Sequence, residues 1–378
     1  MTLLRAAGLH FDGGELPTII QNQANEPGPA LLSAPVIFWL ELTSMCPLRC
    51  KHCFIRPSIN DRSKHIPTHL AMSLIGQAHA MGIFKVTLTG GEALLHPDAF
   101  EIIGEINSLE MGLRIFSSGA LKTSLYQRLE NYRIDTFFLS MDGMEEHHQF
   151  LRGKKSFEKL TNAIETLSAI QSILNITLSI TLDKRNAEYI DEIVSYASAH
   201  RVKTLLVRPI MAYSWTPDAS EFAFSDKFTL LKALETLESV GQRFGVGCQV
   251  NKLPYFPFAK NTFFDDHETN ASLWNILGIR KSIDCVGGNL VCGVRWDGTI
   301  SPCGFLPSHQ QTTSFEPKSV VDLREEWRNS PALMSMRCIP ANQDCHSCSV
   351  QTMCNGGCRA NSVLAGTGIA GVDPYCLV

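Results

Sequence analysis

The sequence predicts an α/β protein, with a partial (βα)6 barrel over residues 35–245 and a small cysteine-rich domain over residues 285–378. Two observations lead to this fold class. Segments of strand character alternate with segments of helical periodicity up to residue 245, and βα units in series build a parallel sheet with right-handed crossovers. After residue 284 this pattern gives way to glycines and nine of the 13 cysteines. Such a region buries little core, so metal clusters would have to hold it together.

The expected strands of the barrel are residues 36–42, 85–89, 113–116, 136–140, 175–182 and 204–207. Helices are expected at residues 68–81, 99–109, 224–244 and 321–328, and a further helix carries a stripe of Ile190, Ile193, Val194 and Ala197. Residues 1–34 are interpreted as a peripheral extension and residues 246–284 as an irregular bridge. Because six units leave a barrel open, the site is expected at the C-terminal strand ends.

The fifth of these strands is the clearest. Its apolar residues alternate with Thr177, Ser179 and Thr181, which is the period of a strand with two different faces. We expect the apolar face to lie under the helices and the polar face to line a lumen that holds a polar ligand.

The bulk properties exclude several classes of protein. The formal net charge is −4, and no basic stripe marks a nucleic-acid surface. The apolar run at residues 36–40 is far shorter than the ~20 residues of a membrane span, and the N-terminus lacks a signal-peptide pattern. A cytoplasmic protein without nucleic-acid or membrane partners is expected. In a reducing compartment, clustered cysteines more often bind metal than form disulfides.

The first cysteine group, Cys46, Cys50 and Cys53, has the spacing CxxxCxxC and follows the first strand. Three thiolates on one loop can hold a cubane iron–sulfur cluster and leave its fourth iron open. An open iron suits a chelating ligand, such as the amino and carboxylate groups of a methionine. A zinc site with a distant fourth ligand, or three unremarkable cysteines, would show the same spacing.

The second motif is Gly90-Gly91-Glu92 at the end of the second strand. Paired glycines let a backbone approach a ligand closely, and the carboxylate could accept from an ammonium group. Alone, the motif is a tight turn with an acidic neighbour. In this order the two motifs resemble the signature of radical S-adenosylmethionine (SAM) enzymes, over about residues 35–210.

This resemblance implies an enzyme in which the open iron binds SAM. Reduction, by a donor such as flavodoxin or ferredoxin, then cleaves SAM to a 5′-deoxyadenosyl radical that removes a hydrogen atom from the substrate. The cofactor supplies the chemistry and the protein supplies orientation.

The resemblance also implies contacts to SAM. The amino group would meet Gly90, Gly91 and Glu92, and the carboxylate would meet Ser140 and Arg152. Ser118 occupies a position where relatives often have asparagine. His52 lies where relatives place an aromatic residue facing the adenine. Ordinary structural roles remain alternatives for Arg152 and His52.

The C-terminal cysteines follow the order C-x12-G-x4-C, C-x2-C-x5-C-x3-C and a final C, which resembles the SPASM domain. The resemblance implies two auxiliary 4Fe–4S clusters, and therefore three clusters in all. The nearer cluster would take Cys285, Cys292, Cys303 and Cys358. The farther cluster would take Cys345, Cys348, Cys354 and Cys376.

Two alternatives remain open for this region. A pair of zinc ribbons also contains C-x2-C units, although the other spacings fit ribbons poorly. If Cys292 were not a ligand, the nearer cluster would have an iron open to substrate. Cys248 and Cys338 are expected to be buried or idle thiols.

Enzymes with a full SPASM domain most often act on peptides. The resemblance therefore implies a maturase that oxidatively modifies a residue of a ribosomally made peptide by a C–C, thioether or related cross-link. Gly304, which follows Cys303, argues against a sulfatase-maturing role, because such relatives carry an acidic residue there. With only about 35 residues before the first strand, no leader-binding domain is expected, so leader recognition would need a separate protein, or the substrate is not a leader peptide.

The alternative is a small-molecule enzyme, namely a dehydrogenase, a decarboxylase or a C–C bond-forming enzyme in cofactor, haem or natural-product synthesis. A third reading is a zinc-stabilised binding module. Arg208, Tyr213 and Trp215, after the sixth strand, are candidate substrate-side residues, and barrel-mouth packing explains them equally well.

Overall fold

The computed structural model describes residues 19–20, 31–53, 64–211, 219–250, 285–306, 322–339, 342–348, 354 and 356–376. Its centre is a nine-stranded sheet with the strand order β11-β10-β3-β4-β5-β6-β7-β8-β9. Neighbouring strands are parallel, except that β10 and β11 are antiparallel. The bounds are β3 Ile37–Thr43, β4 Lys85–Gly90, β5 Gly112–Ser117, β6 Thr136–Ser140, β7 Ile176–Leu182, β8 Thr204–Pro209, β9 Gly247–Val250, β10 Val291–Val294 and β11 Ile300–Ser301. A separate pair joins β1 Ile19–Ile20 to β2 Leu31–Leu32.

The six expected strands are present as β3 to β8, and the α/β fold class is confirmed. The sheet is wider than expected at both edges. β9 lies at the start of the segment that was expected to be irregular, and β10 and β11 come from the cysteine-rich region. Because β10 pairs in parallel with β3, the C-terminal part of the chain contributes directly to the barrel sheet.

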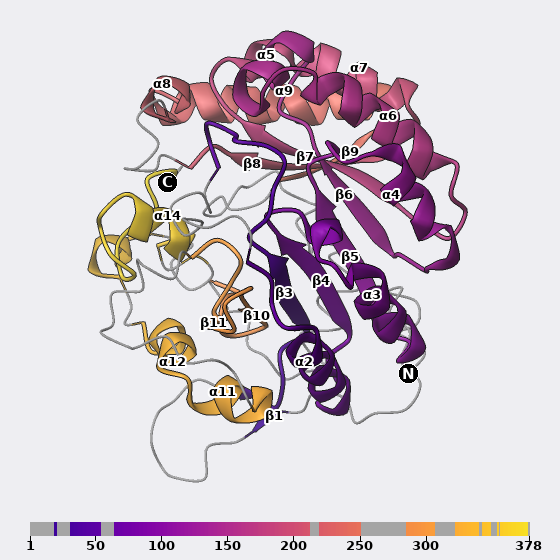
Figure 1. Ribbon diagram of the computed structural model, residues 1–378. Helices are drawn as coiled ribbons and strands as arrows, with labels where there is room; N and C mark the ends of the chain where they lie inside the picture. Colours follow the sequence, from indigo (N-terminus) through magenta and orange to yellow (C-terminus); the bar gives the residue numbers. More distant parts are fainter. Residues whose placement is uncertain are drawn as a thin grey trace.

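Helices cover one side of the curved sheet, where α4, α6, α7 and α9 lie, and α14 lies on the other side (Figure 1). The α-helices are α2 Thr68–Ala80, α3 Ala99–Ser108, α4 Thr123–Gln127, α5 Glu145–Arg152, α6 Ser156–Ser168, α7 Ile190–Ala199, α8 Ala219–Phe222, α9 Lys227–Phe244, α11 Leu323–Asn329, α12 Pro331–Arg337 and α14 Arg359–Leu364. Short 3₁₀ turns are η2 Ala93–Leu95, η3 Arg128–Asn131, η4 Asn186–Tyr189 and η6 Gln343–Cys345. No helix within these ranges is long and apolar enough to cross a membrane.

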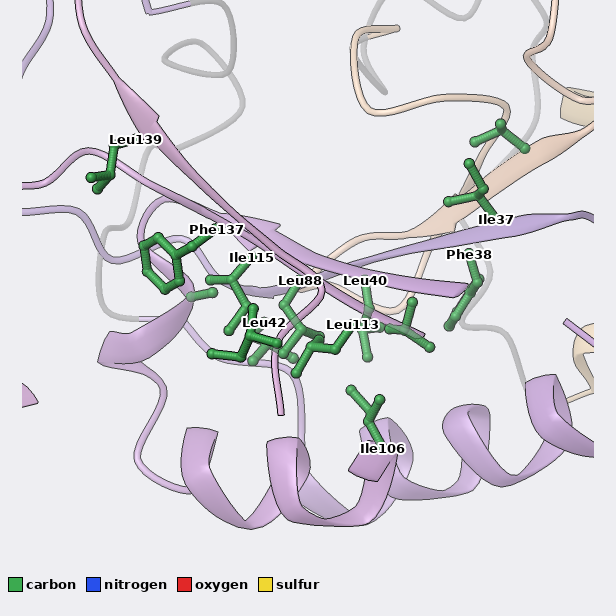
Figure 2. Packing of buried hydrophobic residues seen from close by; sticks show 14 of the residues in the cluster. Ile37, Phe38, Leu40, Leu42, Leu88, Ile106, Leu113, Ile115, Phe137 and Leu139 are labelled. Atoms are coloured by element: carbon green, nitrogen blue, oxygen red, sulfur yellow. The ribbon is translucent and has the colours of Figure 1, made fainter. Parts of the chain in front are cut away.

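The main core lies between the sheet and its helices. Phe38 and Leu40 of β3 and Leu88 of β4 point toward Ile106 of α3 (Figure 2). The apolar residues of β7 and the expected stripe of α7 belong to the same core. Burial of this continuous apolar surface is the main driving force for the barrel.

The other face of the sheet carries a row of aromatic rings. Trp39 of β3 stacks on Phe116 of β5 at 5.4 Å between ring centroids, and Phe116 stacks on Phe138 of β6 at 4.2 Å. Phe305, from the segment after β11, meets Trp39 edge-on at 6.0 Å. The lumen is therefore apolar on one side, while Thr177, Ser179 and Thr181 of β7 give it the expected polar face.

Candidate functional site

The cysteine triplet lies on the loop that leaves the C-terminal end of β3. The start of this loop is held by Thr43, whose hydroxyl oxygen accepts from the Met45 amide at 2.9 Å and donates to the Lys64 carbonyl at 2.8 Å. The pKa of Cys46 is raised to about 12 and that of Cys50 to about 11; burial is the largest cause, and the nearby Cys53 contributes to both increases. The three thiols are thus close enough to interact electrostatically.

The described residues contain no group of three or more His, Cys, Asp or Glu side chains that converges on one metal ion. A tetrahedral zinc site requires such convergence, with every ligand bonded to the same ion. In a cubane cluster each cysteine binds a different iron, so its thiolates surround a larger volume. The arrangement of Cys46, Cys50 and Cys53 is therefore compatible with a cluster.

The Gly90-Gly91-Glu92 turn packs directly against the cysteine loop. The Gly91 amide donates to the Thr43 carbonyl at 2.7 Å, and Gly90 has a φ of +124°. A Cβ atom on Gly91 would lie 2.3 Å from the Met45 carbonyl oxygen, which is closer than any side chain can approach. Glycine is therefore required for the turn and the loop to touch.

Glu92 is almost completely buried beside this turn, with 1% of its surface exposed. Its Oε2 atom accepts from the Ser118 amide at 2.9 Å and from the Ser118 hydroxyl at 2.6 Å. Its Oε1 atom is buried and has no hydrogen-bond partner among the described residues. Burial raises the pKa of Glu92. A buried acceptor of this kind is suited to a cationic donor such as the SAM ammonium.

A second buried charge network joins the cysteine loop to α5. Arg152, the last residue of α5, donates from Nε to Oδ2 of Asp142, and the His52 Nε2 atom lies 3.1 Å from the same oxygen. The Arg152 Nη1 atom is 3.9 Å from Cys50 Sγ. Burial alone would raise the pKa of Asp142, but the charges of Arg152 and His52 outweigh it and hold that pKa well below its usual range.

Arg152 and His52 were expected at the site, but the sequence pattern did not show that Asp142 joins them. Arg152 is buried and ion-paired rather than solvated, and its guanidinium lies beside the first cysteine group. Ser140 is half-buried at the end of β6 and pairs in register with Ser179 of β7. Asp142 follows two residues later, and its Oδ1 atom accepts from the Thr181 amide at 3.2 Å.

The C-terminal cysteines fall into two groups. Cys285, Cys303 and Cys358 pack around one small apolar cluster that includes Met336 and Leu306. The pKa of Cys345 is raised first by burial and then by the charges of Cys376 and Cys348, which shows that these three cysteines lie near one another. Asp373 connects the two groups, since its carboxylate accepts from the Cys358 amide at 2.9 Å and its carbonyl accepts from the Cys376 amide at 2.9 Å. Cys354 is half-buried one turn before Cys358.

The remaining cysteines lie apart from these groups. Cys292 is fully buried in β10 and belongs to the main core. Cys248 is half-buried in β9 beside α9, and Cys338 is exposed. Of the candidate substrate-side residues, Arg208 lies 5.1 Å from the Phe305 ring. Tyr213 and Trp215 are outside the described residues.

Comparison with known proteins agrees with the motifs. Residues 40–197 match the Radical SAM superfamily. The mycofactocin maturase MftC of Mycobacterium tuberculosis is 24% identical over 92% of this chain and 84% of its own length. The AdoMet-dependent heme synthase of Methanosarcina barkeri is 24% identical, covering 92% and 98% of the two chains. The PqqA peptide cyclase of Methylorubrum extorquens is 22% identical, covering 93% and 88%.

Among solved structures, SuiB of Streptococcus suis bound to S-adenosylmethionine superposes with a TM-score of 0.73 and 17% identity, covering 92% of this chain and 78% of that one. At this identity the likeness shows a shared fold. Together with the cysteine triplet and the adjoining Gly-Gly-Glu turn, these matches show that residues 40–197 form a radical SAM domain, the domain of enzymes that bind S-adenosylmethionine at a 4Fe–4S cluster.

Proposed function

We propose that this enzyme is a maturase that oxidatively modifies a residue of a ribosomally made peptide through a C–C, thioether or related cross-link. The observation that carries the proposal is the extent of the likeness to a maturase and a peptide cyclase, which spans more than nine-tenths of the chain. The likeness therefore continues past residue 197 and into the cysteine-rich region. In the same fold, SuiB has been solved bound to its precursor peptide SuiA.

The roles proposed for the first site follow from its donor set. Cys46, Cys50 and Cys53 would hold the cluster, and the bound SAM would supply the 5′-deoxyadenosyl radical. The Oε1 atom of Glu92, which has no hydrogen-bond partner within the described ranges, would accept from the SAM ammonium beside the Gly90 and Gly91 backbone. Ser118 fixes the direction of that oxygen through its two hydrogen bonds.

The SAM carboxylate would be held by Ser140 and Arg152. The ion pair with Asp142 fixes the orientation of the Arg152 guanidinium, and a guanidinium can bind a second carboxylate through its remaining N–H groups. His52 lies against the same guanidinium, with Nε2 at 3.5 Å from Nη2. Its position beside Cys50 would place the imidazole near the cofactor, as expected for the residue before Cys53.

The lumen offers a surface for the substrate. The rings of Trp39, Phe116, Phe138 and Phe305 form an apolar wall, and Arg208 lies over Phe305. Such a wall excludes water, which protects a radical from side reactions. It would suit an apolar or aromatic side chain presented by an extended peptide.

Two auxiliary clusters are part of the proposal. The nearer one would draw on Cys285, Cys303 and Cys358, which share one apolar cluster. The farther one would draw on Cys345, Cys348, Cys354 and Cys376. These clusters would accept the electron left on the substrate after hydrogen removal. A flavodoxin or ferredoxin would supply the reducing electron, and a separate protein would present the leader of the peptide.

The proposal is tested under anaerobic conditions with reconstituted enzyme, strong reductant and SAM. We expect about twelve irons per chain, release of 5′-deoxyadenosine, and loss of paired hydrogens from short peptides encoded beside the enzyme. Changing Cys46, Cys50 and Cys53 to Ala should remove about four irons and all deoxyadenosine, whereas the matched variant Cys248→Ala should retain both. Stoichiometric zinc in place of iron, or deoxyadenosine release that no peptide stimulates, would refute it.

A small-molecule substrate is the second candidate. It is favoured by the likeness to the heme synthase, which extends over 98% of that relative. The two proposals are separated by supplying a haem precursor instead of a peptide. Consumption of the tetrapyrrole coupled to deoxyadenosine release would establish the second candidate and exclude the first.

A further inference from the structure

The position of Cys292 in the sheet decides which way its thiol points. Cys292 of β10 pairs in register with Phe38 of β3, and Gly293 pairs with Trp39. Register partners on neighbouring strands share a face, and successive residues alternate between faces. Phe38 points toward the helices, while the preceding residue Ile37 points away from them (Figure 2). The Cys292 side chain therefore lies on the helix-covered face of the sheet.

The surroundings of Cys292 are apolar and closed to solvent. The residue has 0% of its surface exposed and packs in the same apolar core as Phe38. The charge that acts on the Cys292 thiol is that of Arg337 on α12. The Arg337 Nε atom donates to the Gly288 carbonyl at 2.7 Å, and its guanidinium lies 4.4 Å from the Trp327 ring. A buried free cysteine in such a place acts as a small apolar side chain.

Cys303 belongs to the opposite face. Ser301 pairs with Gly293, so it lies on the face of Trp39. Gly304, the neighbour of Cys303, packs on the Trp39 ring, because a Cβ atom there would lie 3.0 Å from its Cε3 atom. Cys303 also packs with Cys285 and Cys358 around the small apolar cluster of Met336 and Leu306, which is separate from the main core. The strand β10 therefore stands between the Cys292 thiol and this group.

We propose that the nearer auxiliary cluster is held by the three cysteines Cys285, Cys303 and Cys358, and that Cys292 is a core residue that does not reach it. This inference rests on the proposed auxiliary clusters and replaces the four-cysteine ligand set implied by the resemblance. The fourth iron of the nearer cluster is then free of a Cys292 thiolate and open to a ligand from solvent or substrate. Neither remaining cysteine fills the gap, since Cys248 lies beside α9 and Cys338 is exposed.

The first test counts iron and sulfide in reconstituted variants. Cys292→Ala should retain the wild-type content of about twelve irons, whereas the matched variant Cys303→Ala should lose about four. Cys292→Val, which refills the core volume, serves if the alanine variant does not fold. Loss of about four irons in both Cys292 variants would overturn the inference while leaving the auxiliary clusters in place. Full iron content in Cys303→Ala would overturn the inference together with the proposed nearer cluster.

The second test looks for the open iron directly. The background is the full chain with Cys46, Cys50 and Cys53 changed to Ala, which removes the first open-iron cluster. A cubane with one iron free of thiolate readily loses that iron on mild oxidation, so ferricyanide should produce the electron paramagnetic resonance signal of a 3Fe–4S cluster in this background. The signal should be unchanged by Cys292→Ala. A background protein that keeps all its irons and gives no such signal would show a fourth cysteine ligand and refute the proposal.

Discussion

Ser118 binds one oxygen of Glu92 twice, through its amide at 2.9 Å and its hydroxyl at 2.6 Å, and the other oxygen has no hydrogen-bond partner in the part of the chain that the structure describes. Both bonds go to Oε2, so the carboxylate cannot rotate without losing them. The Oε1 atom is consequently held in one direction inside a buried site. A fixed, desolvated acceptor binds a cation more tightly than a mobile one, because its orientation is set before the ligand arrives.

Replacing Ser118 by Ala should weaken SAM binding about tenfold. The substitution removes the hydroxyl bond to a charged acceptor, which is worth about 1.5 kcal/mol or more, and lets the carboxylate turn. Equilibrium dialysis of SAM with the reconstituted protein measures the change. Ser108→Ala, at an exposed position of α3, is the control and should leave the affinity unchanged. Equal affinities in all three proteins would show that Ser118 does not position Glu92.

His148 should make the fold sensitive to mild acid. The residue is buried, and burial followed by the charge of Arg152 lowers its pKa from 6.5 to about 3. Between these values the unfolded chain binds a proton that the folded chain does not, so stability falls as pH falls below about 6.5, by roughly 1.4 kcal/mol per pH unit. His148→Gln, whose amide oxygen can still accept from the Asp142 amide, should lose this dependence.

Urea unfolding at pH 7.5 and pH 5.5 measures the effect. The wild-type protein should lose about 1.4 kcal/mol more than His148→Gln over this interval. His69→Gln, which changes an exposed histidine of α2, should behave as the wild type. Identical pH dependence in His148→Gln and wild type would mean that the pKa of His148 is the same in the folded and the unfolded protein.

Substitutions at Arg152 and Asp142 should change the free energy of unfolding in a strongly non-additive way. Arg152→Gln leaves the Asp142 carboxylate buried without its main partner and should destabilise the protein by about 3 kcal/mol or more. Adding Asp142→Asn removes the uncompensated charge, so the double variant should be more stable than the sum of the single changes predicts. Arg185→Gln, which breaks an exposed pair with Glu221, should cost under about 1 kcal/mol. Additive losses in the double variant would contradict the coupling.

Replacement by alanine should lower the stability of the protein at Gly91 and raise it at Gly76. Gly91→Ala places a methyl group 2.3 Å from the Met45 carbonyl oxygen, so the turn and the cysteine loop must separate. We expect lower stability and loss of the iron bound by the first cysteine group. Gly76→Ala meets nothing within 4 Å on α2 and should stabilise the protein by about 0.5–1 kcal/mol, because alanine favours the helix. Thermal unfolding and iron content of both variants provide the check.

The fold could be predicted where the pattern is local. Strands β3 to β8 are apolar or alternating runs of five to seven residues, and each was expected within a residue or two of its bounds. The β10 strand was missed because it contains a cysteine and a glycine and takes its partner from β3, at the other end of the barrel. The α12 helix was missed because Pro331 reads as a helix stop, although proline is well suited to the first turn where it lies.

The candidate site, like the fold, could be predicted where its residues form a local motif and not where they come together from distant segments. The cysteine triplet and the Gly-Gly-Glu turn are contiguous motifs, and the sequence order alone brings them to neighbouring strand ends. The network of His52, Asp142 and Arg152 joins residues from three loops and elements, so no spacing could reveal it. For Cys292, the cysteine pattern suggested a ligand, and only the strand register shows the direction of its side chain.

The pairing of β10 with β3 has a consequence for synthesis of the chain. The partner of β3 at this edge lies more than 250 residues further along the chain, so the contact between β3 and β10 raises the contact order of the fold. The barrel sheet cannot be completed until Val291 to Val294 have left the ribosome. Until then β3 presents unpaired backbone groups at an apolar edge, which is a template for aggregation. Production of this enzyme therefore depends on the late arrival of its own C-terminal region, and truncating that region would damage the barrel as well as the cysteine groups.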